Sequence, residues 1–92
     1  MAVVEIYTKI FCGFCDAARQ LLEQKKADFV EIPVDGDRAK QASMSERANG
    51  LGTVPQIFIA GRHIGGCDEL FALERDGKLD PLLAQNQAGT PQ

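Results

Sequence analysis

A Cys-Gly-Phe-Cys tetrapeptide at residues 12–15, between an apolar run and an amphipathic segment, constrains the fold of this chain most strongly. Residues 2–7 (AVVEIY) are apolar and rich in β-branched side chains, which predicts a buried strand. From Gly13 to about Ala27, apolar residues recur every three or four positions, as on an amphipathic helix. A strand that leads through the cysteine pair into a helix predicts a β-α-β unit with parallel strands.

Further strands and helices follow this first unit. Pro33 lacks the N–H that a sheet ladder needs, so the second strand should lie at a sheet edge or end there. Asp37 is suited to cap the start of a second helix, and Asn49-Gly50 to close it. Gly61-Arg62 should form the tight turn of an antiparallel hairpin. The expected elements are strand 2–7, helix 13–27, strand 29–34, helix 38–48, strands 56–60 and 63–64, a helix that opens at 67–73, and a last helical turn at 79–84.

These elements predict an α/β fold, a four-stranded mixed β-sheet flanked by about three to four helices. With 92 residues the chain has room for one small domain. We assign residues 1–84 to that domain. Residues 85–92 are polar and contain a glycine and a proline, so we expect a flexible C-terminal tail there.

Charge and hydropathy exclude several classes of partner. The 10 Lys and Arg against 13 Asp and Glu are scattered and form no basic stripe for a nucleic acid. No apolar run approaches the roughly 20 residues that span a bilayer, and residues 1–10 lack the pattern of a signal peptide. We therefore expect a cytoplasmic protein without a nucleic-acid or membrane partner. Where thiols stay reduced, a Cys-x-x-Cys pair among three cysteines is catalytic or metal-binding rather than structural.

The cysteine pair has the setting of a redox site. Cys12 lies where unpaired N–H groups and the helix dipole favour a thiolate, which is the nucleophile of disulfide exchange. Lys9, in the preceding loop, adds a positive charge. Cys15 follows one helical turn later, within reach of the first sulfur. The hypothesis is that Cys12 attacks with a thiol pKa below the ordinary value of about 8.5, and that Cys15 resolves the product.

Two other interpretations of the cysteine pair stay open. A zinc site needs two more ligands, and the available His63 and Cys67 match no zinc-finger spacing. Two inert core thiols would leave unexplained why the pair opens a helix after a strand. The redox interpretation accounts for the whole setting.

Two loops later in the chain supply a candidate binding site. Thr53-Val54-Pro55 precedes a strand, and a cis bond before the proline would turn the valine backbone toward a ligand. Gly65-Gly66 precedes a helix, whose first N–H groups at Cys67 and Asp68 can bind a carboxylate. The Asp68 side chain can bind an ammonium group. Together with Lys9, these groups suit a ligand that has an amino-acid end and a second carboxylate.

Four motifs make the chain resemble a dithiol glutaredoxin of the small bacterial type over residues 2–84. They are Tyr7-Thr8-Lys9, Cys12-Gly13-Phe14-Cys15, Thr53-Val54-Pro55-Gln56-Ile57-Phe58-Ile59 and Gly65-Gly66-Cys67-Asp68-Glu69-Leu70. The resemblance implies a thioredoxin-like fold and a glutathione-dependent thiol–disulfide oxidoreductase of cell redox homeostasis. It implies that Cys12 carries glutathione as a mixed disulfide and that Cys15 resolves protein disulfides.

The resemblance also implies glutathione as co-substrate and assigns residues to it. Lys9 would meet the glycyl carboxylate with help from Gln56. Thr53 and Val54 would hold the cysteinyl backbone beside a cis Pro55, and the start of the following helix would hold the γ-glutamyl end. The implied glutathione site comprises Lys9, Phe14, Thr53, Val54, Pro55, Gln56, Gly66, Cys67 and Asp68. The partners would be glutathione and glutathionylated or disulfide-containing proteins.

Two positions depart from the commonest motif of the family, because Gly13 replaces a proline and Phe14 a tyrosine. In the family, motifs without the proline include some members that bridge a [2Fe–2S] cluster between two subunits. The alternative function is therefore a cluster carrier or sensor, a homodimer held by Cys12 of each chain and two glutathiones. Otherwise we expect a monomer that binds no metal. A thioredoxin-type reductase is a third alternative, against which Gly66-Cys67-Asp68 argues.

The remaining candidates receive structural roles. His63 is expected on the surface of the hairpin, and Cys67 is expected to be a small helix-start residue rather than a third redox thiol. Phe11 and Phe14 flank the cysteines, and we expect them to form an exposed apolar rim for protein substrates. The aromatic residues expected in the core are Tyr7, Phe29, Phe58 and Phe71.

Overall fold

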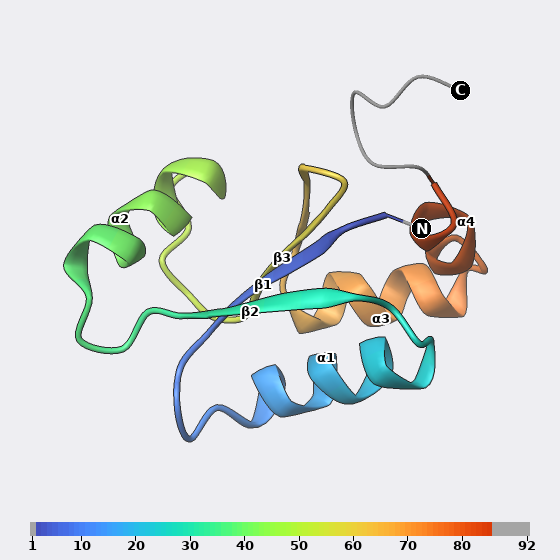
Figure 1. Cartoon of the computed structure of the whole chain (residues 1–92), viewed down its shortest axis with the longest axis horizontal. Helices are drawn as coiled ribbons and strands as arrows, with labels where there is room; N and C mark the ends of the chain where they lie inside the picture. The colour runs from blue at the N-terminus through green and yellow to red at the C-terminus, as the bar shows by residue number, and fades with distance from the viewer. Residues whose placement is uncertain (1, 86–92) are drawn as a thin grey trace.

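The computed structural model describes residues 2–85, which form a mixed four-stranded sheet covered by helices (Figure 1). The strands are β1 (Val4–Thr8), β2 (Phe29–Pro33), β3 (Gln56–Ile59) and β4 (Arg62–Gly65). The helices are α1 (Gly13–Gln24), α2 (Arg38–Arg47), α3 (Cys67–Arg75) and α4 (Leu79–Leu83). Within residues 2–85, no helix has the length and apolarity needed to cross a membrane. The predicted fold class is confirmed.

The strands pair as the β-α-β unit and the hairpin predict. In the spatial order β2-β1-β3-β4, β1 and β2 are parallel, whereas β1–β3 and β3–β4 are antiparallel. Strand β2 is an edge strand and also ends at Pro33, so the missing N–H donor disturbs no ladder.

Three chain segments meet at one end of this sheet. In the antiparallel registers, Tyr7 near the end of β1 lies opposite Gln56 at the start of β3, and Gly65 at the end of β4 lies opposite Ile57. The loop that leads to α1, the loop that precedes β3 and the first turn of α3 therefore converge. This convergence brings together motifs that are about 40 and 50 residues apart in sequence.

Alternation along the strands sends side chains into two cores on opposite faces of the sheet. The larger core joins the sheet to α1, α3 and α4, and Figure 1 shows α1 and α3 on the same side of it. The smaller core lies under α2. Of the aromatic residues expected inside, Tyr7 and Phe58 are buried in the smaller core, whereas Phe29 and Phe71 pack half-buried against the larger one.

Several elements end at other residues than expected. Helix α1 ends at Gln24 rather than Ala27, because Lys26 has a left-handed backbone (φ +56°) and the Ala27 N–H returns to the Leu22 carbonyl at 3.0 Å. Of the predicted tail, only Gln85 lies within the described residues. Among the strands, β1 spans 4–8 rather than 2–7, β2 29–33 rather than 29–34, β3 56–59 rather than 56–60 and β4 62–65 rather than 63–64. Among the helices, α2 spans 38–47 rather than 38–48 and α4 79–83 rather than 79–84.

The turn of the hairpin lies one residue earlier than predicted. Ala60 and Gly61 form it, with φ values of +51° and +80°, and Ile59 pairs directly with Arg62. Two consecutive residues with positive φ are the signature of a type I′ turn, whose twist matches that of the flanking strands. The prediction of a Gly61-Arg62 turn was wrong because Ala60 has a positive φ, a backbone conformation in which alanine is rarely found.

Arg47, the last residue of α2, anchors that helix to the sheet. Its guanidinium donates to the two carboxylate oxygens of Glu5 at 2.9 and 3.2 Å and to the Tyr7 hydroxyl at 2.9 Å. The guanidinium carbon also lies 4.0 Å from the centroid of the Phe58 ring. The hydrogen bonds to Glu5 raise the pKa of Arg47 further above its ordinary value. This contact fixes the helix from which the loop before β3 departs.

Candidate active site

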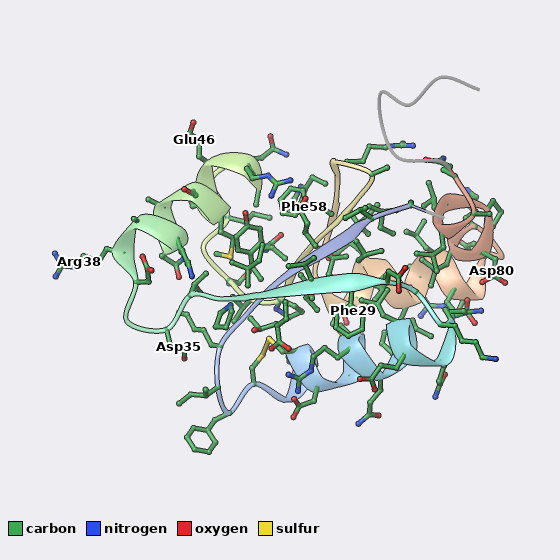
Figure 2. The ribbon with its side chains drawn as sticks, in the orientation of Figure 1. Phe29, Asp35, Arg38, Glu46, Phe58 and Asp80 are labelled. Atoms are coloured by element: carbon green, nitrogen blue, oxygen red, sulfur yellow. A yellow bond between two sulfur atoms is a disulfide. The ribbon has the colours of Figure 1, made fainter. Side chains whose placement is uncertain are left out.

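Cys12 is the N-cap residue of α1, as predicted. Its backbone is extended (φ −115°), and its sulfur accepts the Cys15 N–H at 3.1 Å. The two cysteines form a disulfide with their Cα atoms 5.2 Å apart, seen as the yellow bond at the start of α1 in Figure 2. The sulfur of Cys12 thus faces the positive end of a helix, where N–H groups stabilise negative charge.

The two sulfurs differ in their access to solvent. Cys15 is only 1% exposed, whereas Cys12 is half-buried at the surface. Disulfide exchange proceeds by in-line attack on a sulfur, so an incoming thiolate can reach Cys12 but not Cys15. The fold therefore distinguishes an accessible sulfur from a sheltered one.

The loop before Cys12 presents apolar side chains to solvent. Phe11 is 100% exposed and has a positive φ of 53°, while Ile10 and Phe14 are largely exposed. The Ile10 N–H donates to both carboxylate oxygens of Asp35, at 3.0 and 3.2 Å, which ties the loop to the chain after β2. Asp35 is labelled in Figure 2 beside this loop. The predicted apolar rim at Phe11 and Phe14 is confirmed as an exposed feature.

A groove of about 310 Å³ begins beside the disulfide. The Val54 carbonyl oxygen lies 4.0 Å from the Cys12 sulfur, and the Val54–Pro55 bond is cis, as the resemblance implied. The start of α1, the loop before β3 and the first turn of α3 supply its walls. The lining residues are Phe14, Thr53, Val54, Pro55, Gly66, Cys67, Asp68 and Glu69. Seven of the nine residues predicted to hold a ligand thus share one cavity.

The far wall of the groove is the first turn of α3. The Gly66 N–H donates to the Glu69 carboxylate at 2.7 Å, which closes the turn before the helix. Gly65 has a φ of +121°, and a Cβ placed there would lie 2.8 Å from the same carboxylate oxygen. A glycine is therefore required at this position. The next N–H groups, of Cys67 and Asp68, belong to the helix start, where no intrahelical acceptor is in reach.

Glu69 is a groove residue that the sequence analysis did not single out as one. A glutamate three residues after the cap residue is the pattern of a capping box, and this signal could have identified it.

Two predicted ligand residues lie outside the groove. Lys9 is exposed at the end of β1 and lines separate hollows with the Ile10-Phe11 loop and with the start of α2. Gln56 is buried, with its side chain between Thr53 and His63. The prediction that His63 lies on the hairpin surface was wrong. Its ring is half-buried, with its centroid 5.0 Å from that of Phe58, because strand alternation turns it toward the smaller core.

The zinc interpretation gains no support from the geometry. Within residues 2–85, no three His, Cys, Asp or Glu side chains gather closely enough to hold a metal ion. Cys12 and Cys15 are bonded to each other, and His63 is engaged with Gln56.

Cys67 is the free cysteine of the described chain, and its surroundings disfavour its thiolate. Burial raises the pKa of the Cys67 thiol, and the neighbouring Asp68 and Glu69 carboxylates add to this increase. A thiol with a raised pKa stays protonated at neutral pH, and only the thiolate is reactive.

We expect iodoacetamide to modify Cys12 of the reduced protein roughly ten-fold or more faster than Cys67 at pH 7. The difference should narrow at more alkaline pH, where the Cys67 thiol ionises in its turn. Peptide mass mapping of timed samples measures both rates in one experiment. Faster modification of Cys67 at pH 7 would contradict this assignment.

Known proteins resemble the chain over nearly its whole length. Residues 4–64 match a family model described as Glutaredoxin. The chain is 55% identical over 83 residues to Glutaredoxin 3 of Escherichia coli (strain K12), a match that covers 90% of this chain and 99% of that protein. It is 51% identical over 84 residues to a glutaredoxin of Pseudomonas aeruginosa, with 91% and 99% covered.

Solved structures show the same likeness. A crystal structure of a buckwheat glutaredoxin–glutathione complex has a TM-score of 0.81 and 38% identity, and the match covers 89% of this chain and 76% of that one. A solution structure of glutaredoxin from Brucella melitensis has a TM-score of 0.80 and 46% identity, with 100% and 96% covered.

Proposed function

Since this chain belongs to the glutaredoxin family and is a glutathione-dependent thiol–disulfide oxidoreductase, we propose that Cys12 and Cys15 divide its chemistry between two substrate classes. Cys12 alone serves glutathionylated substrates, and both cysteines serve protein disulfides. The observation that carries this division is the accessible Cys12 sulfur at the mouth of a groove, with the sheltered Cys15 sulfur bonded behind it.

On a glutathionylated substrate, the Cys12 thiolate attacks the glutathione sulfur. The Cys12–glutathione disulfide forms as the substrate–glutathione bond breaks, and the substrate sulfur leaves as a thiolate that takes up a proton. A second glutathione thiolate then attacks the glutathione sulfur on Cys12. Oxidised glutathione leaves, and the Cys12 thiolate is restored under the stabilising N–H groups of α1.

On a protein disulfide, Cys12 attacks one substrate sulfur and releases the other as a thiolate. The Cys15 thiolate, one helical turn away, then attacks the Cys12 sulfur of the mixed disulfide. The second substrate thiol leaves, and the Cys12–Cys15 disulfide forms. Two glutathiones reduce this disulfide, the first by attack on the accessible Cys12 sulfur.

The groove suits the glutathione moiety of these intermediates. The α-carboxylate of the γ-glutamyl end fits the N–H groups of Cys67 and Asp68, and its ammonium fits the Asp68 carboxylate. The Val54 backbone stands beside the cysteinyl unit. The remaining proposed contacts are Thr53, Pro55, Gly66 and the exposed Phe14 ring along the walls, with Lys9 and Gln56 assigned from the family resemblance alone.

We propose the monomer as the working form, because Cys12, Cys15 and the groove of one chain supply every protein group that the exchange steps above use. Exchange that is supplied with reduced glutathione suits a reducing compartment, so we propose that the protein acts in the cytoplasm.

A [2Fe–2S] cluster, the alternative that Gly13 raises, would need Cys12 from two chains and two external thiols. This arrangement asks for one sulfur from each chain, so the lack of a three-residue metal site within residues 2–85 does not count against it. The Cys12–Cys15 disulfide favours the oxidoreductase, because it occupies the sulfur that a cluster would need. Anaerobic reconstitution with iron, sulfide and glutathione separates the two, because a charge-transfer spectrum together with a dimer mass belongs to the carrier.

The proposed function predicts turnover of a glutathionylated peptide by the purified chain. The assay contains glutathione, glutathione reductase and NADPH, and follows NADPH consumption. Activity that saturates with the glutathionylated peptide supports the proposal. A wild-type chain that is folded, reduced and yet inactive would overturn it.

Asp68→Asn tests the site for the γ-glutamyl ammonium. We expect KM for the glutathionylated peptide to rise about ten-fold, because a hydrogen bond to a charged group contributes about 1.5–3 kcal/mol. The change in kcat should be small, since Asp68 is remote from the exchanging sulfurs in this placement. High salt should shrink the difference between the variant and the wild type, because salt screens an exposed ion pair.

Asp76→Asn is the matched control for this substitution. Asp76 is also an exposed aspartate, the cap residue that follows α3 at the opposite end of the helix from the groove. The Asp76→Asn substitution removes the same charge from the chain as Asp68→Asn. An equal rise in KM in both variants would therefore show a general charge effect and contradict the contact assigned to Asp68.

A further inference from the structure

A hydrogen-bonded chain of three side chains, with the buried Gln56 at its centre, ends at the groove. His63 Nε2 lies 2.7 Å from Gln56 Oε1, and Gln56 Nε2 lies 3.3 Å from Thr53 Oγ1. Gln56 is only 2% exposed, so its amide has no access to bulk water. Thr53 is exposed and lines the groove. The chain thus joins a residue of β4 to the ligand side of the loop before β3.

The orientation of the Gln56 amide gives this chain a direction. An amide has an acceptor end and a donor end, so Oε1 toward His63 requires that His63 donate through its Nε2–H. The other end of the amide donates to the Thr53 oxygen. Because that oxygen already accepts a hydrogen bond, the hydroxyl hydrogen of Thr53 is free to point into the groove as a donor.

His63 is what keeps the amide in this orientation. Its ring packs against Phe58, with centroids 5.0 Å apart, and this contact limits its rotation. A reversed amide would set its NH₂ group against the Nε2–H of His63, and two donors cannot bond to each other. The neutral Nε2–H tautomer and the imidazolium both donate at Nε2, whereas the neutral Nδ1–H tautomer accepts there, so this direction belongs to the two states that carry a proton on Nε2.

We propose that His63 is a positioning residue that acts through Gln56 to make Thr53 a hydrogen-bond donor toward an acceptor oxygen of the glutathione moiety. Such an oxygen is a peptide carbonyl or a carboxylate. The inference rests on the proposed function, because it adds a specificity contact to the same groove. It gives Gln56, whose side chain does not line the groove, an indirect role toward the ligand.

His63→Phe tests the donor without removing the ring. Phenylalanine keeps an aromatic side chain against Phe58 but has no N–H for Gln56. We expect KM for the glutathionylated peptide to rise about three- to ten-fold, the value of one hydrogen bond, while kcat and the alkylation rate of Cys12 stay as in the wild type. Arg62→Ala, at an exposed neighbouring position on β4, is the control and should leave KM unchanged.

A double-mutant cycle separates positioning from a general loss of structure. Thr53→Val removes the hydroxyl from a side chain of nearly the same shape, and should raise KM by a similar factor. Because His63 acts through that hydroxyl, the variant with both substitutions should have no higher KM than Thr53→Val alone. Multiplicative effects on KM, or a fall in kcat at unchanged KM, would overturn the inference.

Nitrogen NMR of the wild-type imidazole gives a readout that does not depend on turnover. We expect His63 Nε2 to carry a proton and to show a coupling or shift typical of a hydrogen-bonded N–H. An unprotonated Nε2 at neutral pH would reverse the direction of the chain and overturn the inference, whatever the activity. If the NMR result is as expected and the wild type shows no turnover, the proposed function fails and the side-chain arrangement stands.

Discussion

Cys12→Ser is expected to abolish turnover of both glutathionylated peptides and protein disulfides, a loss of about a thousand-fold or more. A serine hydroxyl is not ionised at neutral pH and cannot form a disulfide, so neither route can begin. The N-cap role survives, because a serine oxygen also accepts a helix N–H. The loss should therefore be chemical, and thermal unfolding of the variant should match that of the reduced wild type.

Cys15→Ser is the matched comparison, because it makes the same change one helical turn further on. We expect turnover of the glutathionylated peptide to stay within a few-fold of the wild type, since glutathione clears Cys12 without help. Reduction of a protein disulfide should fall steeply, because the mixed disulfide has lost its resolving thiol.

The same NADPH-coupled assay measures both substrate classes for both variants. If Cys12→Ser were active on the glutathionylated peptide and Cys15→Ser inactive, Cys15 would be the attacking cysteine and Cys12 the resolving one. The buried position of the Cys15 sulfur makes that outcome the sharpest contradiction of the structure.

Phe58→Ala is expected to lower the free energy of unfolding by about 3–5 kcal/mol. Phe58 is 2% exposed and lies in the smaller core, where Figure 2 shows it between the sheet and α2. Its ring contacts Tyr7 edge-on at 5.7 Å, His63 at 5.0 Å and the Arg47 guanidinium at 4.0 Å. Alanine would leave a cavity under α2, where the Arg47 guanidinium of that helix lies over the Phe58 ring.

Thermal and urea unfolding followed by circular dichroism measure this loss. A destabilisation of about 3 kcal/mol would lower Tm by more than about 12 °C in a domain of this size. Phe58→Leu should cost less, because it keeps part of the buried volume. Val30→Ala, at an exposed position of the edge strand β2, should change stability little. A Phe58→Ala variant as stable as Val30→Ala would show that α2 is held by other contacts.

The order and type of the elements could be predicted from the sequence because their causes are local. The spacing of apolar residues on α1, the cap at Asp37 and the missing N–H of Pro33 each act within a few residues, and the structure confirms all three. The hairpin turn was predicted one residue too late, because the rule that glycine supplies positive φ takes no account of the strand register. The pairing of Ile59 with Arg62 places Ala60 in the turn, where it has a positive φ.

The candidate site was predictable only in part, for the same reason. The N-cap position of Cys12 and the helix start at Cys67 follow from nearby sequence, and both are observed. His63 was misassigned to the surface because its neighbours along the chain say nothing of the Phe58 ring beside it. Gln56 was predicted to bind the ligand, but its side chain does not line the groove. Glu69 was not predicted as a site residue, but it does line the groove.

The sequence by itself was enough to predict a candidate nucleophile, to place it at a helix N-terminus and to identify the family of the chain. Only the tertiary structure decided which sulfur is accessible, which loops form the groove and which side chains direct the Thr53 hydroxyl. Burial and hydrogen-bond partners depend on segments that meet across the sheet, where Tyr7 lies opposite Gln56 and Gly65 opposite Ile57. Those encounters are set by strand pairing over distances of up to about 50 residues, beyond the reach of any local pattern.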